Sequence, residues 1–209
     1  MNNTVYLYIF DTMADWEIGY LSAEIHSARY FKKEQEPLKI VTMSNTKKTI
    51  VTMGGLSVVP DIEIGEFNIN DAAALILPGG NTWTDQIHNS VLSIAEQCLK
   101  NNTIVGAICG ATIGLARVGL LDQRYHTSND LEFLKIICPN YIGENYYMTD
   151  STVIDGNLVT ASGIAPLDFT VQILRKLDVF SPEVLDLWHQ LYTTQEPKYF
   201  FEIMQLIQK

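Results

Sequence analysis

The stretch that decides the fold is TIVGAICGAT at positions 103–112. Its first six residues are apolar or small and rich in β-branched side chains, as in strands that are buried on both faces of a parallel sheet. The run leads directly into Cys109, and small residues stand two positions before and two after it, at Ala107 and Ala111. A sharp strand-to-helix turn requires such small neighbours. The stretch therefore predicts an α/β fold with Cys109 at the end of a buried strand.

Similar apolar runs lie on both sides of this stretch, and segments with helical spacing of apolar residues follow them. Strands that alternate with helices predict right-handed crossovers and a mostly parallel sheet covered on both faces. The predicted strands are 5–10, 38–43, 72–77 and 103–108, and the predicted helices are 15–33, 91–100, 110–119, 130–137 and one that begins at Pro166.

Two short segments are predicted as hairpins, and the end of the chain as helix only. Residues 50–59 carry a Gly-Gly pair, and residues 155–157 carry an Asp-Gly pair that favours a tight turn. From Ser181 onward apolar residues keep helical spacing. We expect one α/β domain over 1–180, with 181–209 as a helical extension packed on it. The extension serves core packing or a dimer surface in one interpretation and covers the pocket as a lid in another.

The composition restricts the class of partner. The chain has 209 residues and a formal charge of −10, from 24 acidic and 14 basic residues. A surface this acidic repels phosphate backbones, which argues against a nucleic acid partner. The sequence shows neither a signal-peptide pattern nor an apolar run of the ~18 residues that a membrane helix needs. We therefore expect a cytoplasmic protein that binds a small molecule and no membrane.

Three cysteines, Cys98, Cys109 and Cys138, are widely spaced and odd in number. This argues against a disulfide framework and against a zinc site with paired cysteines, and no metal or cofactor is predicted. At Cys109 the start of a helix is expected to stabilise a thiolate and lower the pKa below its usual value of ~8.5. The alternative is an inert, buried cysteine. Cys98 and Cys138 have no such setting and are predicted to be structural.

Four motifs occur in the order and spacing of a known family. They are the acidic residue of Asp15-Trp16-Glu17, Leu77-Pro78-Gly79-Gly80, Ala107-Ile108-Cys109, and Gly119-Leu120-Leu121 followed by His126-Thr127. Together they resemble the DJ-1/PfpI superfamily, which has the class I glutamine amidotransferase-like fold, over residues 5–177. The resemblance implies a flavodoxin-like three-layer sandwich, a nucleophilic cysteine at the turn, and a homodimer.

The resemblance assigns catalytic roles to Glu17 and His126 beside Cys109. Glu17 would place a protonated carboxyl against the thiolate, because an apolar pocket and a nearby negative charge both raise a carboxyl pKa. The alternative is an acid that simply favours a helix N-terminus. His126 would act as base or acid, although a histidine in a polar loop is often only a surface residue.

Glycines beside the cysteine are candidates for binding an oxyanion. The N–H groups of Gly79, Gly80 and Gly110 could together hold the negative oxygen that forms when a thiolate attacks a carbonyl. The glycines also suit a tight turn. Residues 160–168 resemble the family's loop-to-helix segment that passes near the pocket.

The sequence departs from two branches of the superfamily. The protease-like branch has histidine directly after the cysteine, where this chain has Gly110, and the His-x-Glu pair of glutamine amidotransferases is absent. A nucleotide site is disfavoured because no Gly-x-Gly-x-x-Gly or Gly-Lys-Ser/Thr loop occurs. Two functions remain open: an enzyme with glyoxalase-like or hydrolase/amidase-like chemistry on small reactive carbonyl or C–N compounds, and a non-catalytic redox sensor of the stress response that forms a sulfinate.

Overall fold

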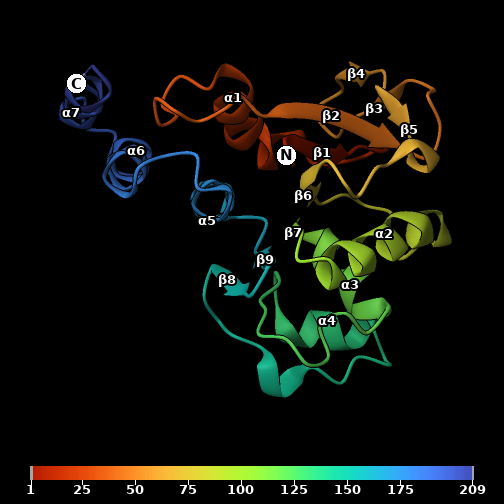
Figure 1. Ribbon diagram of the computed structural model, residues 1–209. Helices are drawn as coiled ribbons and strands as arrows, with labels where there is room; N and C mark the ends of the chain where they lie inside the picture. The colour runs from red at the N-terminus through yellow and green to blue at the C-terminus, as the bar shows by residue number, and fades with distance from the viewer. Residues whose placement is uncertain (1, 209) are drawn as a thin grey trace.

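The computed structural model describes residues 2–208 and contains a seven-stranded sheet in the order β5-β2-β1-β6-β7-β9-β8 (Figure 1). All neighbouring strands are parallel except β8 and β9, which form an antiparallel hairpin. This confirms the predicted α/β class with a mostly parallel sheet. The strands of this sheet are β1 (Thr4–Tyr8), β2 (Lys39–Ser44), β5 (Ile62–Glu63), β6 (Ala72–Leu77), β7 (Ile104–Ile108), β8 (Thr152–Asp155) and β9 (Leu158–Ala161).

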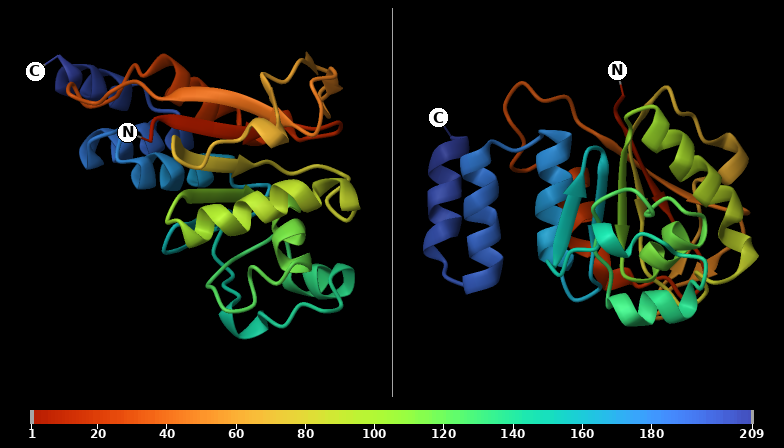
Figure 2. Two further views of the ribbon diagram at one scale, coloured as in Figure 1. Left: turned by 45° about the vertical axis from the view of Figure 1, so that its right-hand side comes forward. Right: turned by 90° about the horizontal axis from the view of Figure 1, so that it is seen from below.

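Helices cover both faces of the sheet, as Figure 2 shows from two further sides. Helices α1 (Gly19–Ser27) and α5 (Pro166–Leu177) pack against each other on one face, and α2 (Asn89–Lys100) and α3 (Gly110–Arg117) lie on the other. The remaining helices are α4 (Leu131–Ile137), α6 (Pro182–Thr194), α7 (Lys198–Ile207) and the 3-10 turns η1 (Asp15–Glu17), η2 (Ile64–Glu66), η3 (Gln86–His88) and η4 (Glu144–Tyr146).

Most predicted elements are present, but the first helix is shorter than expected. The pattern predicted helix over 15–33, whereas the chain forms η1 and then α1, which ends at Ser27. The helix stops because Ala28 adopts a left-handed conformation, with φ of 50°, and Arg29 turns back to the carboxylate of Glu24. Both predicted hairpins are confirmed: β3 (Ile50–Val51) pairs with β4 (Ser57–Val58), and β8 pairs with β9.

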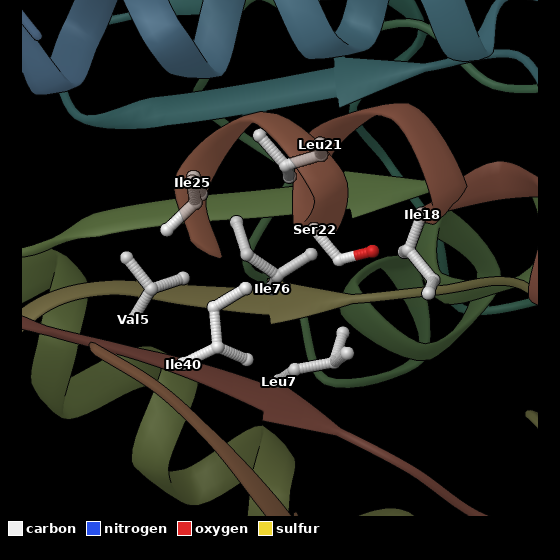
Figure 3. A pocket seen from close by; sticks show the side chains of 8 residues that line it. All are labelled: Val5, Leu7, Ile18, Leu21, Ser22, Ile25, Ile40 and Ile76. Carbon is white, nitrogen blue, oxygen red and sulfur yellow. The ribbon is translucent and has the colours of Figure 1, made fainter. Parts of the chain in front are cut away.

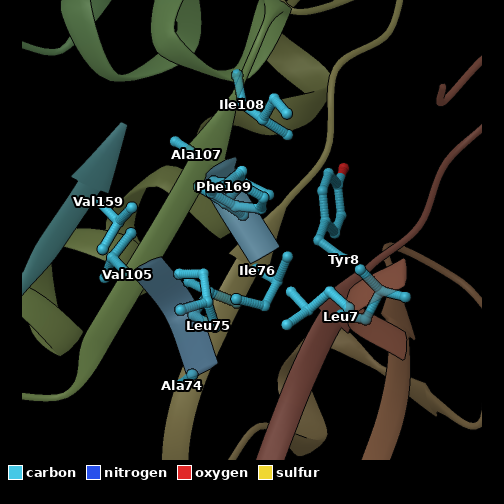
Figure 4. Close-up of a cluster of buried hydrophobic side chains, with 14 of the residues drawn as sticks. Leu7, Tyr8, Ala74, Leu75, Ile76, Val105, Ala107, Ile108, Val159 and Phe169 are labelled. Carbon is cyan, nitrogen blue, oxygen red and sulfur yellow. The ribbon is translucent and has the colours of Figure 1, made fainter. Parts of the chain in front are cut away.

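The core lies where the central strands meet the helices (Figure 4). Leu75 and Val105 are fully buried at paired positions of β6 and β7 (Figure 4). Phe169 of α5 is also fully buried and lies against the face of the sheet formed by the next pair, Ile76 and Gly106. A β-carbon on Gly106 would lie 2.9 Å from the Phe169 ring. Glycine at this position therefore allows α5 to approach β7 closely.

A small crevice remains between α1 and strands β1, β2 and β6 (Figure 3). Its volume is about 10 Å³, and its walls are apolar except for Ser22. This is at most the volume that one buried water needs, and an apolar cavity of that size stays dry. The crevice therefore offers no room for a ligand.

The last two helices pack beside α5 and α1 rather than over the carboxyl ends of the strands (Figure 1). Trp188 of α6 is fully buried, and its indole N–H donates to Glu24 of α1 at 2.9 Å. His189 of the same helix lies 2.8 Å from the Asp168 carboxylate at the start of α5. No helix within residues 2–208 is both long and apolar enough to cross a membrane.

Candidate active site

Three strand ends meet at Cys109. Strand β7 has β6 on one side and β9 on the other, with Leu77 level with Ala107 and Ala161 level with Ile108. The segments that follow, Gly79 after β6 and Gly163 after β9, therefore flank Cys109. Ligands in open α/β sheets bind at this edge, beyond the carboxyl ends of the strands.

The backbone of Cys109 is strained. Its φ of 58° and ψ of −124° lie outside the regions that suit residues with a side chain. Two hydrogen bonds hold it there: the Cys109 N–H donates to the Ala161 carbonyl at 2.9 Å, and the Thr112 hydroxyl donates to the Cys109 carbonyl at 2.6 Å. Such strain at a cysteine that begins a helix is typical of nucleophilic turns.

Glu17 is a fully buried carboxyl beside this cysteine. Its Oε2 accepts the Gly79 N–H at 2.6 Å, whereas its Oε1 has no hydrogen-bond partner among the described residues. A β-carbon on Gly163 would lie 2.7 Å from the Cys109 sulfur and 3.1 Å from Oε1, so both atoms border the same small space. Burial raises the pKa of Glu17 to about 7. A protonated Oε1 can then donate to the sulfur.

The structure contradicts the predicted low pKa of Cys109. The pKa of the Cys109 thiol is raised to about 11, first by burial and second by the charge of Glu17. Hydrogen bonds from Asn129 and from the Gly110 N–H lower the pKa of the thiol, but by less than burial and the Glu17 charge raise it. The two groups act as a coupled pair, because an ionised Glu17 disfavours the thiolate and a protonated one favours it. The sequence could not predict this, since it does not report the burial.

Asn129 completes the contacts of the sulfur. Its Nδ2 donates to the Cys109 Sγ at 3.2 Å, and its Oδ1 accepts the Gly163 N–H at 2.8 Å. The second contact fixes the amide orientation, because only the Oδ1 atom can accept from an N–H. The sequence pattern pointed to His126, three residues earlier in the same loop, and not to Asn129. An amide has no titratable group and no motif of its own, and only its position near the cysteine could have indicated it.

His126 is not brought into contact with Cys109. The ring is fully buried, with Nδ1 2.6 Å from the Arg124 carbonyl and Nε2 2.7 Å from the Tyr141 hydroxyl. Because a carbonyl only accepts, Nδ1 carries the proton, and Nε2 accepts from the tyrosine. Burial lowers the pKa of His126 and favours this neutral form. The geometry therefore gives no support to the prediction that His126 moves a proton at Cys109.

The three predicted glycines differ in what they do. The Gly79 N–H is already bonded to Glu17, so it positions the carboxyl rather than an oxyanion. The Gly110 N–H interacts with Cys109 at the helix start. A β-carbon on Gly80 would lie 2.5 Å from the Phe10 ring, so this glycine permits close packing. A β-carbon on Gly110 would lie 2.8 Å from the Gly80 carbonyl oxygen, which leaves no room for histidine there.

A surface groove of about 400 Å³ adjoins the site. Asn129 and Ser162 line it, and Asn129 also contacts the Cys109 sulfur. Cys98 and Cys138 lie elsewhere, buried in the core, where burial raises both thiol pKa values. Within residues 2–208 no group of three or more histidine, cysteine or acidic side chains could hold a metal ion.

The comparison with protein families agrees with this geometry. The DJ-1/PfpI family matches residues 3–176, which cover the sheet, Glu17 and the cysteine turn. The chain belongs to the DJ-1/PfpI family. The family resemblance inferred from four short motifs is thereby confirmed, together with the fold that it implied.

Two curated proteins of Bacillus subtilis (strain 168) are similar to this chain. The protein named "Uncharacterized protease YoaZ" is 53% identical over 205 residues, which are 98% of each chain. The one named "Uncharacterized protease YdeA" is 31% identical over 182 residues, which are 85% of each chain.

Solved structures of the DJ-1/PfpI family show the same fold. The thiJ/pfpI family protein from Bacillus anthracis has a TM-score of 0.96 and 51% identity, with 100% of this chain and 99% of that chain covered. The DJ-1 superfamily protein Atu0886 from Agrobacterium tumefaciens has a TM-score of 0.80 and 29% identity, with 92% and 98% covered.

Proposed function

We propose that this protein is a cysteine-dependent enzyme that acts on small reactive carbonyl or C–N compounds. Cys109 is the nucleophile, and Glu17 takes and returns its proton. The observation that carries the proposal is the Glu17 carboxyl, which is fully buried with one oxygen unpartnered, borders the cysteine sulfur and has a pKa of about 7. General acid–base groups are most effective when their pKa lies near the working pH.

The first step is the addition of the thiol to the carbonyl carbon. Glu17 removes the Sγ proton, the new S–C bond forms, and the electron pair of the C=O bond moves to its oxygen. Asn129 and the Gly110 N–H, which both interact with the sulfur, are donors near the place where that negative oxygen forms. Glu17 then returns its proton to the oxygen and is again a carboxylate. The high pKa of the free thiol is no obstacle, because the proton leaves as the S–C bond forms.

Both Bacillus subtilis relatives are named as proteases, which are hydrolases. The 53% identity of the first therefore supports hydrolysis as the reaction of this protein. Peptide hydrolysis by a cysteine with an adjacent histidine is not supported here. Gly110 occupies the position of that histidine without room for a larger residue, and both ring nitrogens of His126 have other partners. Small amides and 2-oxoaldehydes suit the site better than peptides.

A redox sensor is the second candidate, and the packing around the sulfur favours it over a peptidase. Cys109 is half-buried, and a β-carbon on Gly163 would lie 2.7 Å from the sulfur, so the backbone after β9 packs closely against one side of the thiol. Two molecules of hydrogen peroxide would convert the thiol to a sulfinic acid and release two molecules of water. Asn129 and a protonated Glu17 would donate hydrogen bonds to the sulfinate oxygens.

The decisive experiment measures turnover of methylglyoxal and of small primary amides by the wild type, Cys109→Ala, Glu17→Gln and the control Cys138→Ala. We expect a loss of at least about a hundredfold in kcat/KM for the first two variants, because each removes a group that reacts in the transition state. The control should keep wild-type activity. If the wild type turns over neither class of compound while peroxide converts Cys109 to a sulfinate, the enzyme proposal fails and the sensor is supported.

A further inference from the structure

The groove beside Cys109 is lined by hydroxyl and carboxylate groups. Two loops, 127–131 and 147–151, form it together with the residues that follow β9. Its lining carries the hydroxyls of Ser128, Tyr147, Ser151 and Ser162 and the carboxylates of Asp130 and Asp150, and no lysine, arginine or histidine among the described residues. The side chains that meet a ligand here are therefore neutral or negative.

Several of these groups are held in place by hydrogen bonds. The Asp130 carboxylate accepts the Phe133 N–H at 2.7 Å as the N-cap of α4, and this contact holds the side chain in one orientation. Ser128 and Tyr147 join their hydroxyls at 3.2 Å, and Ser151 donates to Asp168 at 2.8 Å. The walls of the groove are therefore ordered before a ligand binds.

The groove is also connected to the nucleophile. Asn129 lines it and donates to the Cys109 sulfur, and Ser162 lines it and lies 3.5 Å from the Asn129 Oδ1. A molecule that lies in the groove therefore meets Asn129, the residue that also contacts the nucleophile.

We propose that this groove is a charge-selective substrate site, which admits uncharged or cationic carbonyl compounds that carry hydroxyl groups and disfavours those that carry a carboxylate. The inference deepens the proposed function and rests on it. Hydroxyl groups of the ligand can exchange hydrogen bonds with the hydroxyls of the lining. A carboxylate would instead face Asp130 and Asp150 without a cation to pair with.

The test uses thiol reagents of one chemistry and three charges, so that it does not depend on turnover. Methyl, trimethylammonioethyl and sulfonatoethyl methanethiosulfonates each transfer a thioalkyl group to a thiolate, with formation of a disulfide bond and release of methanesulfinate. Second-order rate constants at Cys109 are measured by peptide mass spectrometry at low salt and divided by those of 2-mercaptoethanol. The variants are Asp150→Asn and Asp130→Asn, of which the second keeps a residue that caps helices equally well.

We expect the normalised ratio of the cationic to the anionic rate to exceed one in the wild type. It should fall about threefold in each variant, because a unit charge acting through water over roughly 12 Å changes the cationic and the anionic rate by about 1.8-fold each, in opposite directions. The matched control is Glu202→Gln on α7, which changes the net charge equally at an exposed position of the C-terminal helix. A wild-type ratio near one, or an equal fall in Glu202→Gln, would overturn the proposal, because the groove would then have no selectivity of its own.

A second readout separates this proposal from the proposed function. The wild type should turn over methylglyoxal, which is neutral, at least about tenfold more efficiently than glyoxylate, which carries a carboxylate. Equal efficiencies for the two compounds would overturn the charge selection while the enzyme proposal stands. Turnover of neither would overturn the enzyme proposal, and the labelling ratios would still decide whether the groove selects by charge.

Discussion

Asn129 donates a hydrogen bond to the sulfur of Cys109 at 3.2 Å although the two residues come from different loops at the sheet edge. Its other amide atom accepts from the Gly163 N–H, so one side chain joins the loop after α3 to the loop after β9. The sulfur therefore lies between a neutral donor and the titratable carboxyl of Glu17. The balance between these two neighbours sets its reactivity.

Replacing Asn129 by Asp is expected to slow alkylation of Cys109. The substitution exchanges an N–H donor for an acceptor of negative charge beside the sulfur, and both changes disfavour the thiolate. The iodoacetamide rate constant at pH 8, read at the Cys109 peptide, should fall at least about tenfold. Asn140→Asp on the surface serves as the control of equal charge. An unchanged rate in Asn129→Asp would mean that the amide does not act on the sulfur.

Replacing Glu17 by Gln is expected to lower the pKa of Cys109 from its value of about 11, of which the Glu17 charge is the second-largest cause. The amide removes that charge and offers an N–H. The midpoint of iodoacetamide labelling against pH should move down by at least about one unit, the size expected for loss of a nearby like charge. A midpoint that stays at the wild-type pH would show that the two side chains do not interact.

The same carboxyl makes stability depend on pH. Its folded pKa of about 7 lies above the usual 4.5, so the folded state binds the proton more tightly than the unfolded state. The stabilising effect of that protonation is fully present below about pH 4.5 and is lost as the pH rises through 7. The shift corresponds to about 3 kcal/mol.

Urea unfolding of the wild type and Glu17→Gln at pH 5 and pH 8 measures this effect. Subtraction of the two proteins removes the contribution of all other groups. We expect the wild type to lose about 2.5 kcal/mol more than the variant between these pH values, since part of the full effect lies below pH 5. Parallel changes in both proteins would show that Glu17 titrates at an ordinary pKa.

The architecture of this protein could be predicted from sequence because local pattern determines it. The apolar run at 72–77 is strand β6, and Pro166 begins α5 as its fixed φ favours. Glu17 was identified by its motif and lies beside Cys109 as that motif implied. These features depend on neighbours in the chain or on a family pattern, which a sequence displays directly.

The electrostatics of the site could not be predicted, because they depend on contacts between distant segments. The cysteine pKa is raised by burial, which no local pattern reports. His126 has the residue type of a base, but Tyr141, 15 positions away, occupies its Nε2. Asn129 is significant only because Gly163, 34 positions away, turns its amide toward the sulfur.

The C-terminal helices are expected to stabilise the α/β domain through Trp188. This side chain is fully buried, and its indole N–H donates to the buried carboxylate of Glu24. Trp188→Ala should lower the free energy of unfolding by about 3–5 kcal/mol, because it leaves a large cavity. Trp188→Phe keeps most of the volume and loses the donor, and should cost about 1–3 kcal/mol.

Urea unfolding followed by circular dichroism checks both values, with Phe201→Ala as the control, since Phe201 on α7 is 61% exposed. That control should change the free energy of unfolding by less than about 0.5 kcal/mol. A small effect of Trp188→Ala would instead indicate that residues 181–209 unfold separately. The two variants of Trp188 therefore decide whether the extension belongs to the cooperative core, because only a shared core transmits the loss to the whole domain.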